Sequence, residues 1–219
     1  IKKLQLLETL DVRRTRIEIL PTQVMELPCL IHLFGKFKLQ QGVGGRKMLK
    51  LQTWCSENSK LETVAGFVVD NNKSQGFAQL MEHMKHLTKV KIWCDSTADV
   101  TKLVHVLGAT KKFIGGGLDM TRVDRSLSID LQGCPTECSE QFMDSLQATG
   151  RLTSLKLRGK LMRLPRFKAK LNYIEELCLS RTNLSGHTIL DGLSELRMTL
   201  KCLKLVEDKL GHLVIKPEH

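Results

Sequence analysis

One leucine pattern, L-x-x-L-x-L, recurs from one end of this chain to the other and restricts the possible folds more than any other feature. Clear copies are Leu7-x-x-Leu10-x-Val12 and Leu152-x-x-Leu155-x-Leu157, while the copy at Leu27-x-x-Leu30 continues imperfectly to Leu33. The residues that mark successive copies are 10, 30, 64, 90, 127, 155, 177 and 203, at intervals of 20, 34, 26, 37, 28, 22 and 26 residues. Repeats of 20 to 29 residues with irregular insertions indicate a leucine-rich repeat.

The alternation within each copy predicts a short strand whose leucines point inward while the residues between them face solvent. A single copy cannot bury its leucines alone, so neighbouring copies must stack and form one shared core. We therefore predict an α/β leucine-rich-repeat solenoid of about eight irregular repeats, occupying residues 1–219 as one domain. It should be curved, with short parallel strands on the concave face and short helices and loops on the convex face.

Four segments have the apolar spacing of short helices and fall within the intervals between strands. They are Phe77-Leu80-Met81-Met84, Val100-Leu103-Val104-Leu107, Phe142-Met143-Leu146 and Ile189-Leu190-Leu193-Leu196. Two glycine-containing segments, Gln40 to Lys50 and Lys111 to Asp119, are interpreted as surface loops.

Composition agrees with a core of branched aliphatic side chains, because the chain has 37 leucines but only ten aromatic residues. The net charge is +11, which favours acidic partners of some kind. No apolar run is long enough to span a membrane, since the longest is residues 64–69.

The ends and the cysteines suggest where such a chain works. It opens at Ile1 without an initiator Met or a secretory leader, so we interpret it as a fragment of a longer multidomain protein. Seven cysteines form no regular framework, which favours reduced thiols and a cytoplasmic or nuclear location.

No enzymatic or metal chemistry is predicted. The segment Gly42 to Lys47 resembles a phosphate-binding loop, but Met48 stands where that loop requires Ser or Thr. Cys134 and Cys138 would supply only half of a zinc site, and neither they nor His83 and His86 have further ligands at suitable spacing. The other histidines lie in no recognisable nucleophile context.

The solvent-facing positions of the predicted strands are the best candidates for function. Six of them are basic and three acidic, and a tryptophan beside a lysine resembles the aromatic anchor of a binding hot spot. Trp93 could equally pack against a flanking loop or another domain of the parent protein. The candidate partner-binding residues are Arg13, Phe67, Lys89, Lys91, Trp93, Asp130, Lys156, Arg158, Glu176 and Lys204.

The segment from Leu7 to Pro21, LETLDVRRTRIEILP, with Val24, Leu27, Leu30 and His32-Leu33 after it, resembles a known family. It is similar to the leucine-rich-repeat region of plant intracellular nucleotide-binding disease-resistance proteins (NLRs) of the coiled-coil class.

This resemblance implies a non-enzymatic module of an innate immune receptor. Such a module binds a pathogen effector, a guarded host protein or the receptor's own nucleotide-binding domain, which it helps to hold inactive. The resemblance places ATP or ADP in that separate domain, with no cofactor in this segment, and any oligomer would form through the parent protein.

Two alternatives come from the residues themselves. The +11 charge would suit a nucleic-acid-binding protein, although the few aromatic residues and the lack of a nucleic-acid motif count against it. An extracellular receptor domain would use the glycosylation sequons at Asn72 and Asn183.

Overall fold

The structure is a computed structural model that describes residues 3–40, 45–70, 75–98, 100–115, 124–134, 140–147, 152–167, 171 and 173–207. Within these ranges the backbone forms a nine-stranded sheet in which every pairing is parallel. The strands follow one another in sequence order, except that β2 pairs only with β3. They are β1 Thr9–Asp11, β2 Ile19–Leu20, β3 His32–Leu39, β4 Thr63–Val69, β5 Lys89–Cys94, β6 Ser126–Asp130, β7 Ser154–Arg158, β8 Glu176–Ser180 and β9 Cys202–Val206.

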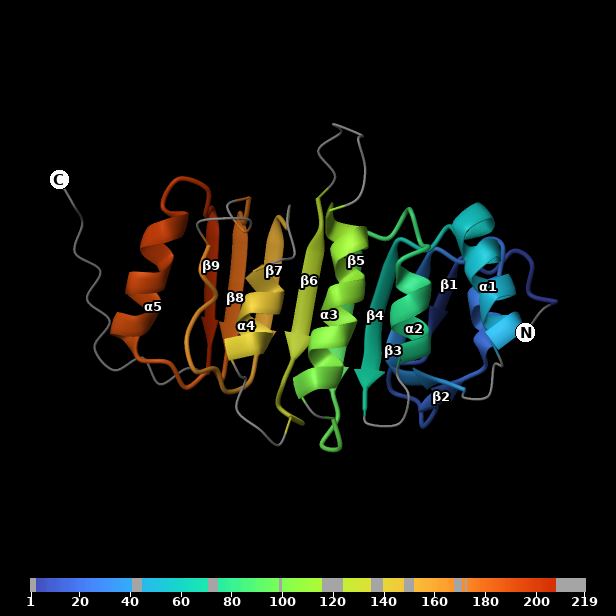
Figure 1. Ribbon diagram of the computed structural model, residues 1–219, viewed down its shortest axis with the longest axis horizontal. Helices are drawn as coiled ribbons and strands as arrows, with labels where there is room; N and C mark the ends of the chain where they lie inside the picture. Colours follow the sequence, from blue (N-terminus) through green and yellow to red (C-terminus); the bar gives the residue numbers. More distant parts are fainter. Residues whose placement is uncertain are drawn as a thin grey trace.

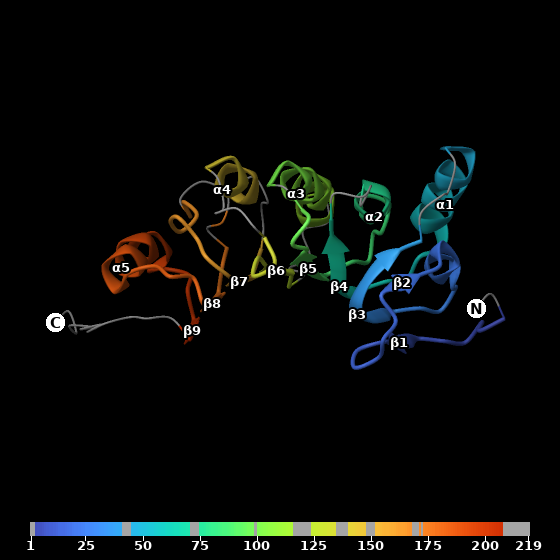
Figure 2. The same cartoon turned by 90° about the horizontal axis from the view of Figure 1, so that it is seen from below.

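All the α-helices lie on one side of this sheet (Figure 1). They are α1 Gly45–Asn58, α2 Gln75–Met81, α3 Val100–Gly115, α4 Glu140–Gln147 and α5 Gly186–Leu193, with 3-10 turns η1 Thr22–Glu26 and η2 Ser194–Leu196. Seen from below, the strands follow an arc with the helices on its outer side (Figure 2). We call the side of the sheet without helices the concave face. This α/β arrangement is compatible with the predicted solenoid.

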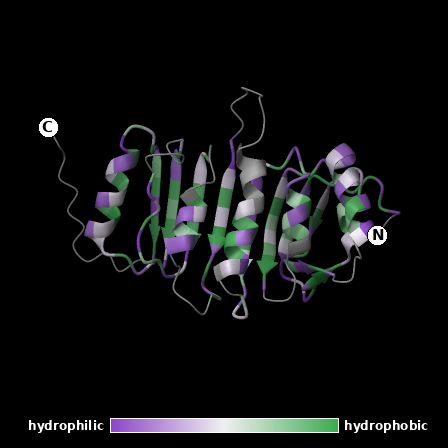
Figure 3. Ribbon diagram, viewed as in Figure 1, coloured by the Kyte–Doolittle hydropathy of each residue, from purple (hydrophilic) through white to green (hydrophobic). Residues whose placement is uncertain are grey.

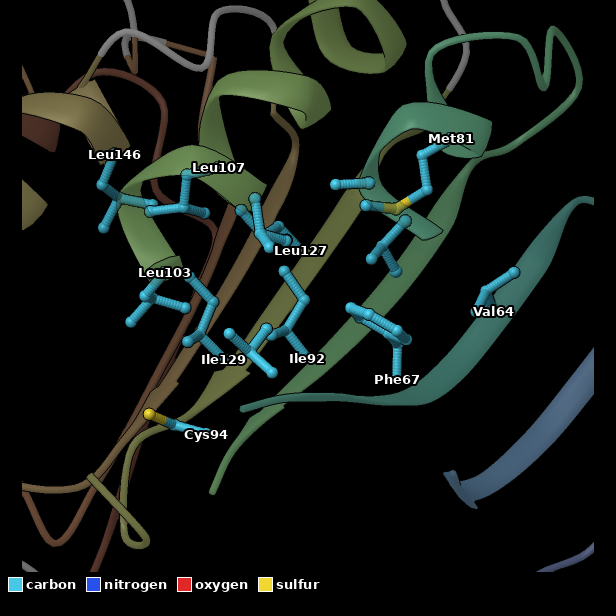
Figure 4. Packing of buried hydrophobic residues seen from close by; sticks show 14 of the residues in the cluster. Val64, Phe67, Met81, Ile92, Cys94, Leu103, Leu107, Leu127, Ile129 and Leu146 are labelled. Carbon is cyan, nitrogen blue, oxygen red and sulfur yellow. The ribbon is translucent and has the colours of Figure 1, made fainter. Parts of the chain in front are cut away.

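The core lies between the sheet and the helices. Both the strands and the helices carry apolar and polar residues (Figure 3). Side chains from β4, β5 and β6 meet side chains from the helices in this layer, as Ile92 and Ile129 do with Leu103 and Leu107 (Figure 4). Burying one such side chain contributes about 1.5–3 kcal/mol. Among the described residues, no helix has the length and apolar content needed to cross a bilayer.

Strand pairing confirms seven of the eight predicted repeat markers and corrects one. The residues that share one inward register are Leu10, Leu33, Val64, Val90, Leu127, Leu155, Leu177 and Leu203. The second marker is therefore Leu33, and Leu30 was wrong by three residues. Leu30 is buried just before β3, so it takes the first position of the pattern, as Leu7 and Leu61 do in their copies.

The four predicted helices are present, although α2 ends at Met81, before Met84, and Leu196 lies in η2 after α5. The two predicted loops are corrected in part. Helix α1 begins at Gly45 and includes Met48, Leu51 and Cys55, whose spacing of three and four residues places them on the side that faces the core. Helix α3 continues to Gly115, so the first half of the second predicted loop is helical. Residues 41–44 and 116–119 lie outside the described ranges.

The pairing register shifts near a glycine in both β3 and β4. Phe34 pairs with Ala65 and Phe37 with Phe67, while Ala65 pairs with Lys91 and Phe67 with Ile92. Between these pairings β4 has one more residue than β5, and β3 has one more than β4. The additional residue in β4 is a β-bulge that exchanges the faces of the side chains after it, whereas β3 has two residues more than β5 and keeps its alternation.

The bulge in β4 corrects the prediction for Phe67. Simple alternation placed Phe67 on the concave face, but after the bulge it occupies the inward register of Ile92 and is 1% exposed. Its ring stacks on Phe77 of α2, with 4.3 Å between ring centroids. Phe67 is therefore a core residue and not part of a binding surface.

Candidate interaction surface on the concave face

The concave face carries three rows of side chains, because the strands are in register from β5 to β9. The first row contains Lys89, Ser126, Ser154, Glu176 and Cys202. The second contains Lys91, Ser128, Lys156, Cys178 and Lys204. The third contains Trp93, Asp130, Arg158, Ser180 and Val206. Eight of the ten predicted site residues lie in these rows, so the sheet brings them together.

Trp93 is the aromatic centre of this surface. It is half-exposed, and two ammonium groups lie against its ring: Lys91 Nζ is 4.1 Å and Lys36 Nζ 5.2 Å from the ring centroid. A cation over an indole face is stabilised by the ring quadrupole. Partial burial lowers the pKa of Lys91, and the charges of Arg158 and Lys156 lower it further, whereas Asp130 opposes them. Trp93 is thus held within a cluster of positive charge.

A second aromatic group lies at the other end of the concave face. Arg13 is 4.8 Å from the ring centroid of Phe34, and Phe34 stacks on His32 at 5.9 Å. Asp11 accepts hydrogen bonds from Arg13 Nε and Nη2, at 3.0 and 2.6 Å. Arg13 is exposed as predicted, but its charge is already balanced by a neighbour.

Asp130 lies in the predicted row, but it is buried and not available to a partner. It is 2% exposed, and its Oδ1 accepts a hydrogen bond from the backbone N–H of Gln132. Arg158 Nη1 lies 3.9 Å from Asp130 Oδ2, which has no hydrogen-bond partner. Asp130 therefore acts as an internal counter-charge, which corrects its assignment as a contact residue.

The remaining predicted residues are accessible. Lys89, Lys156, Glu176 and Lys204 are exposed, and Arg158 is half-exposed.

The metal-binding motifs considered in the sequence are not assembled into a site in the described part of the chain. No group of three or more His, Cys, Asp or Glu side chains there could hold a metal ion. His83 and His86 lie in the turns after α2 and not on a helix. Residues 42–44, Asn72 and Cys138, which carried the other candidate motifs, fall outside the described ranges.

Comparison with known proteins shows which proteins this chain resembles in sequence. No family model matches the chain. Over 217 residues, 99% of its length, the chain is 42% identical to a protein of Oryza sativa subsp. japonica described as Disease resistance protein RGA4. The chain is therefore similar, over almost its whole length, to one part of a protein described as a plant disease-resistance protein. A second rice protein of the same description matches equally well, and the resemblance predicted from the repeat motifs is confirmed.

The chain spans about a fifth of the length of the curated relatives that it matches, 20% and 21%. The similarity therefore concerns a segment of those proteins. It covers the whole sheet described above.

Sequence reasoning missed two residues of the surface, Phe34 and Lys36. Both lie on β3, whose register was displaced by the choice of Leu30 as a marker. The pattern Leu30-x-x-Leu33 would have placed Phe34 on the concave face, since it follows the second leucine directly. Lys36, two residues further on, is exposed between buried Gly35 and Phe37, so the same marker would have placed it on the concave face as well.

A partly buried ion-pair cluster links the ends of β3, β4 and β5. Lys38 Nζ of β3 lies 2.9 Å from Oδ2 of Asp70, after β4, and 2.9 Å from Oδ2 of Asp95, after β5. Partial burial opposes the charge on Lys38, but the hydrogen bonds to both carboxylates outweigh it and raise its pKa. The hydrogen bond from Lys38 is the largest cause of the lowered pKa of Asp95. One lysine thus links the ends of three consecutive inner strands.

We expect Lys38→Met to lower the free energy of unfolding by about 2 kcal/mol, because buried Asp70 loses this cation; the loss stays below that of a fully buried pair, since the Lys38 side chain is 36% exposed. The raised pKa of Lys38 gives stability that is present below its ordinary value of 10.5 and lost at higher pH. The lowered pKa of Asp95 gives stability that is present above 3.8 and lost in acid. Urea unfolding should therefore show the largest difference from the unmodified chain between these values.

Lys36→Met is the matched control, since Lys36 is exposed two residues earlier on the same strand. It should change the unfolding free energy by less than about 1 kcal/mol. Equal losses in the two variants, or a difference that persists unchanged below pH 3, would contradict the role assigned to Lys38.

Proposed function

We propose that this chain is a non-enzymatic recognition and autoinhibition segment of a plant innate immune receptor. It forms one leucine-rich-repeat solenoid of about eight irregular repeats over residues 1–219, within a longer cytoplasmic or nuclear protein. Its partner is a pathogen effector, a guarded host protein or the receptor's own nucleotide-binding domain, and ATP or ADP belongs to that other domain. Homology to a disease resistance protein supports this assignment.

The observation that carries the proposal is the cluster of cations around Trp93 on the side of the sheet that no helix covers. Lys91 and Lys36 lie over the indole, and Lys156 is close enough to influence the pKa of Lys91. Exposed aromatic and basic side chains in one patch are typical of protein interfaces. Several like charges together also steer acidic partners toward the surface and select against basic ones.

A variant of the complete receptor that carries Lys91→Glu, Lys156→Glu and Trp93→Ala tests the proposal. Arg158 is left unchanged because it faces buried Asp130. Loss of partner binding should abolish the cell-death response to the cognate effector in leaves, whereas loss of an internal contact should give cell death without effector. Circular dichroism of the 219-residue chain checks that the variant folds. A folded variant that responds as the unmodified receptor does would refute the assignment.

Nucleic acid is the second candidate partner, and the +11 net charge is the observation that favours it. Such binding would weaken steeply as salt increases, because condensed counterions are released from the phosphates. A gel-shift titration at low salt is expected to show no complex.

A further inference from the structure

The basic residues of the concave face are not spread evenly over the strands. From β5 to β9, the odd-numbered strands contribute the cations and the even-numbered strands contribute small or acidic side chains. In the second row this gives Lys91, Ser128, Lys156, Cys178 and Lys204 in turn. Adjacent strands are about 4.8 Å apart, so successive lysines are separated by about 9.6 Å.

Several other cations of the sheet and its adjoining turns have a carboxylate partner. Arg13 is paired with Asp11, Lys38 with Asp70 and Asp95, Arg181 with Glu207, and Lys201 with Glu175. Among the described residues, no carboxylate lies within ion-pair distance of Lys91, Lys156 or Lys204. The second row is therefore a line of three lysines whose charges are not neutralised within the described structure.

The side chains between these lysines leave space for an anion and offer a donor. Ser128 and Cys178 are short and half-exposed, and each lies between two lysines of the neighbouring strands. A carboxylate above Ser128 would face Lys91 and Lys156 and could accept a hydrogen bond from the hydroxyl. A carboxylate above Cys178 would face Lys156 and Lys204, with only a weak thiol donor.

We propose that the partner of this surface is an acidic protein segment that presents two carboxylates about 9.6 Å apart, one above Ser128 and one above Cys178. This inference rests on the proposed function of the concave face and specifies the chemistry of its partner. Lys156 is the key residue, because it serves both positions, while Lys91 and Lys204 serve one each. The spacing excludes alternate residues of an extended strand, which lie about 6.6 Å apart.

Polyproline peptides can test this spacing. Two glutamates three residues apart in a polyproline helix lie on the same side of the helix, about 9.3 Å from each other. The probes are synthetic peptides with the sequences Glu-Pro-Pro-Glu, Glu-Pro-Glu and Gln-Pro-Pro-Gln between glycines. Binding is followed by the fluorescence of Trp93 in the 219-residue chain carrying Trp54→Phe, which leaves one tryptophan. We expect Glu-Pro-Pro-Glu to bind about tenfold more tightly than Glu-Pro-Glu, and the glutamine peptide not to bind.

Substitutions then test the arrangement of the lysines. Lys156→Gln should weaken the binding of Glu-Pro-Pro-Glu about tenfold, and Lys204→Gln should weaken it less. Lys156→Arg should retain binding, which separates loss of charge from a failure to fold. Lys85→Gln, in the turn after α2, is the matched control and should have no effect.

Three results would overturn the inference: equal affinity for both glutamate spacings, a Lys156→Gln variant that behaves like Lys85→Gln, or tighter binding of a single-stranded oligonucleotide at the same salt. None of these three results would contradict the proposed function, provided that the receptor carrying Lys91→Glu, Lys156→Glu and Trp93→Ala still responds differently from the unmodified receptor. An unaltered receptor response would refute the proposed function itself, whatever the peptides do.

Discussion

Replacing Gly66 by alanine is expected to cost at least about 4 kcal/mol of unfolding free energy, more than most single substitutions cost. Gly66 has a φ of +134°, a region that residues with a Cβ rarely adopt. A Cβ at this position would also lie 1.3 Å from the carbonyl oxygen of Gly35 on the neighbouring strand. Because the obstacle is backbone, no side-chain rotation can relieve it, and β3 and β4 would have to separate.

Gly108→Ala is the control for this prediction. Gly108 lies within α3, and no atom lies within 4 Å of the Cβ that the substitution adds. Alanine favours a helix over glycine by about 0.8–1 kcal/mol, so this variant should be slightly more stable than the unmodified chain. Urea unfolding monitored by circular dichroism measures both. A Gly66→Ala chain as stable as Gly108→Ala would contradict the bulge in β4.

The second large effect is expected at Phe67, where alanine should lower the unfolding free energy by about 3–5 kcal/mol. The ring is 1% exposed and stacks on Phe77, which also lies edge-on to Phe37, with 6.4 Å between ring centroids. Removing Phe67 therefore leaves a cavity beside the Phe77 ring of α2, which in turn contacts Phe37 of β3. Simple alternation along β4 would instead place the ring in solvent, where its loss would cost little.

Phe34→Ala separates these two interpretations. Phe34 is half-exposed on the concave face, where it contacts Arg13 and His32. Its removal should cost only about 1 kcal/mol. If the two alanine variants unfold at the same urea concentration, Phe67 does not occupy the core as described.

The regular part of the sheet could be predicted from the sequence because one physical rule governs it. From β5 to β9, leucine, valine or isoleucine occupies the same two inward positions of every strand, and every predicted strand there is in register. The four helices were likewise predictable, because their apolar residues recur at three and four residue spacing.

The first half of the sheet was less predictable because its deviations depend on contacts between strands. A glycine inside a strand is a known sign of a bulge, and Gly35 and Gly66 both carried that sign. The sequence does not show how many residues each bulge adds, since this follows from the pairing of β3, β4 and β5. Helix α1 was missed because its apolar residues are interspersed with basic ones and follow a glycine-rich segment.

The candidate surface, too, could be predicted in part from alternation and in part only from contacts between strands. The rows on β5 to β9 follow from alternation alone, and they contain eight of the ten predicted residues. Burial of Asp130 and the position of Lys36 over Trp93 depend on side chains from other strands, which alternation does not describe. Which lysines have a carboxylate partner and which do not can likewise be determined only from distances between strands.

The most direct test of the central claim compares two charge reversals of equal size on opposite sides of the sheet. One set changes Lys91, Lys156 and Lys204 to glutamate, and the other changes Arg46, Lys47 and Lys50, which are exposed on α1. Each set lowers the net charge of the chain from +11 to +5, because each reversal removes two units. Glutamates near the start of α1 also suit the helix dipole, so the control should remain folded.

The measurement is the cell-death response of the complete receptor in leaves, with and without its cognate effector. We predict that the concave set abolishes the response or makes it independent of effector, while the α1 set behaves as the unmodified receptor does. Identical behaviour of the two sets, whether both active or both inactive, would contradict a binding function of the concave face.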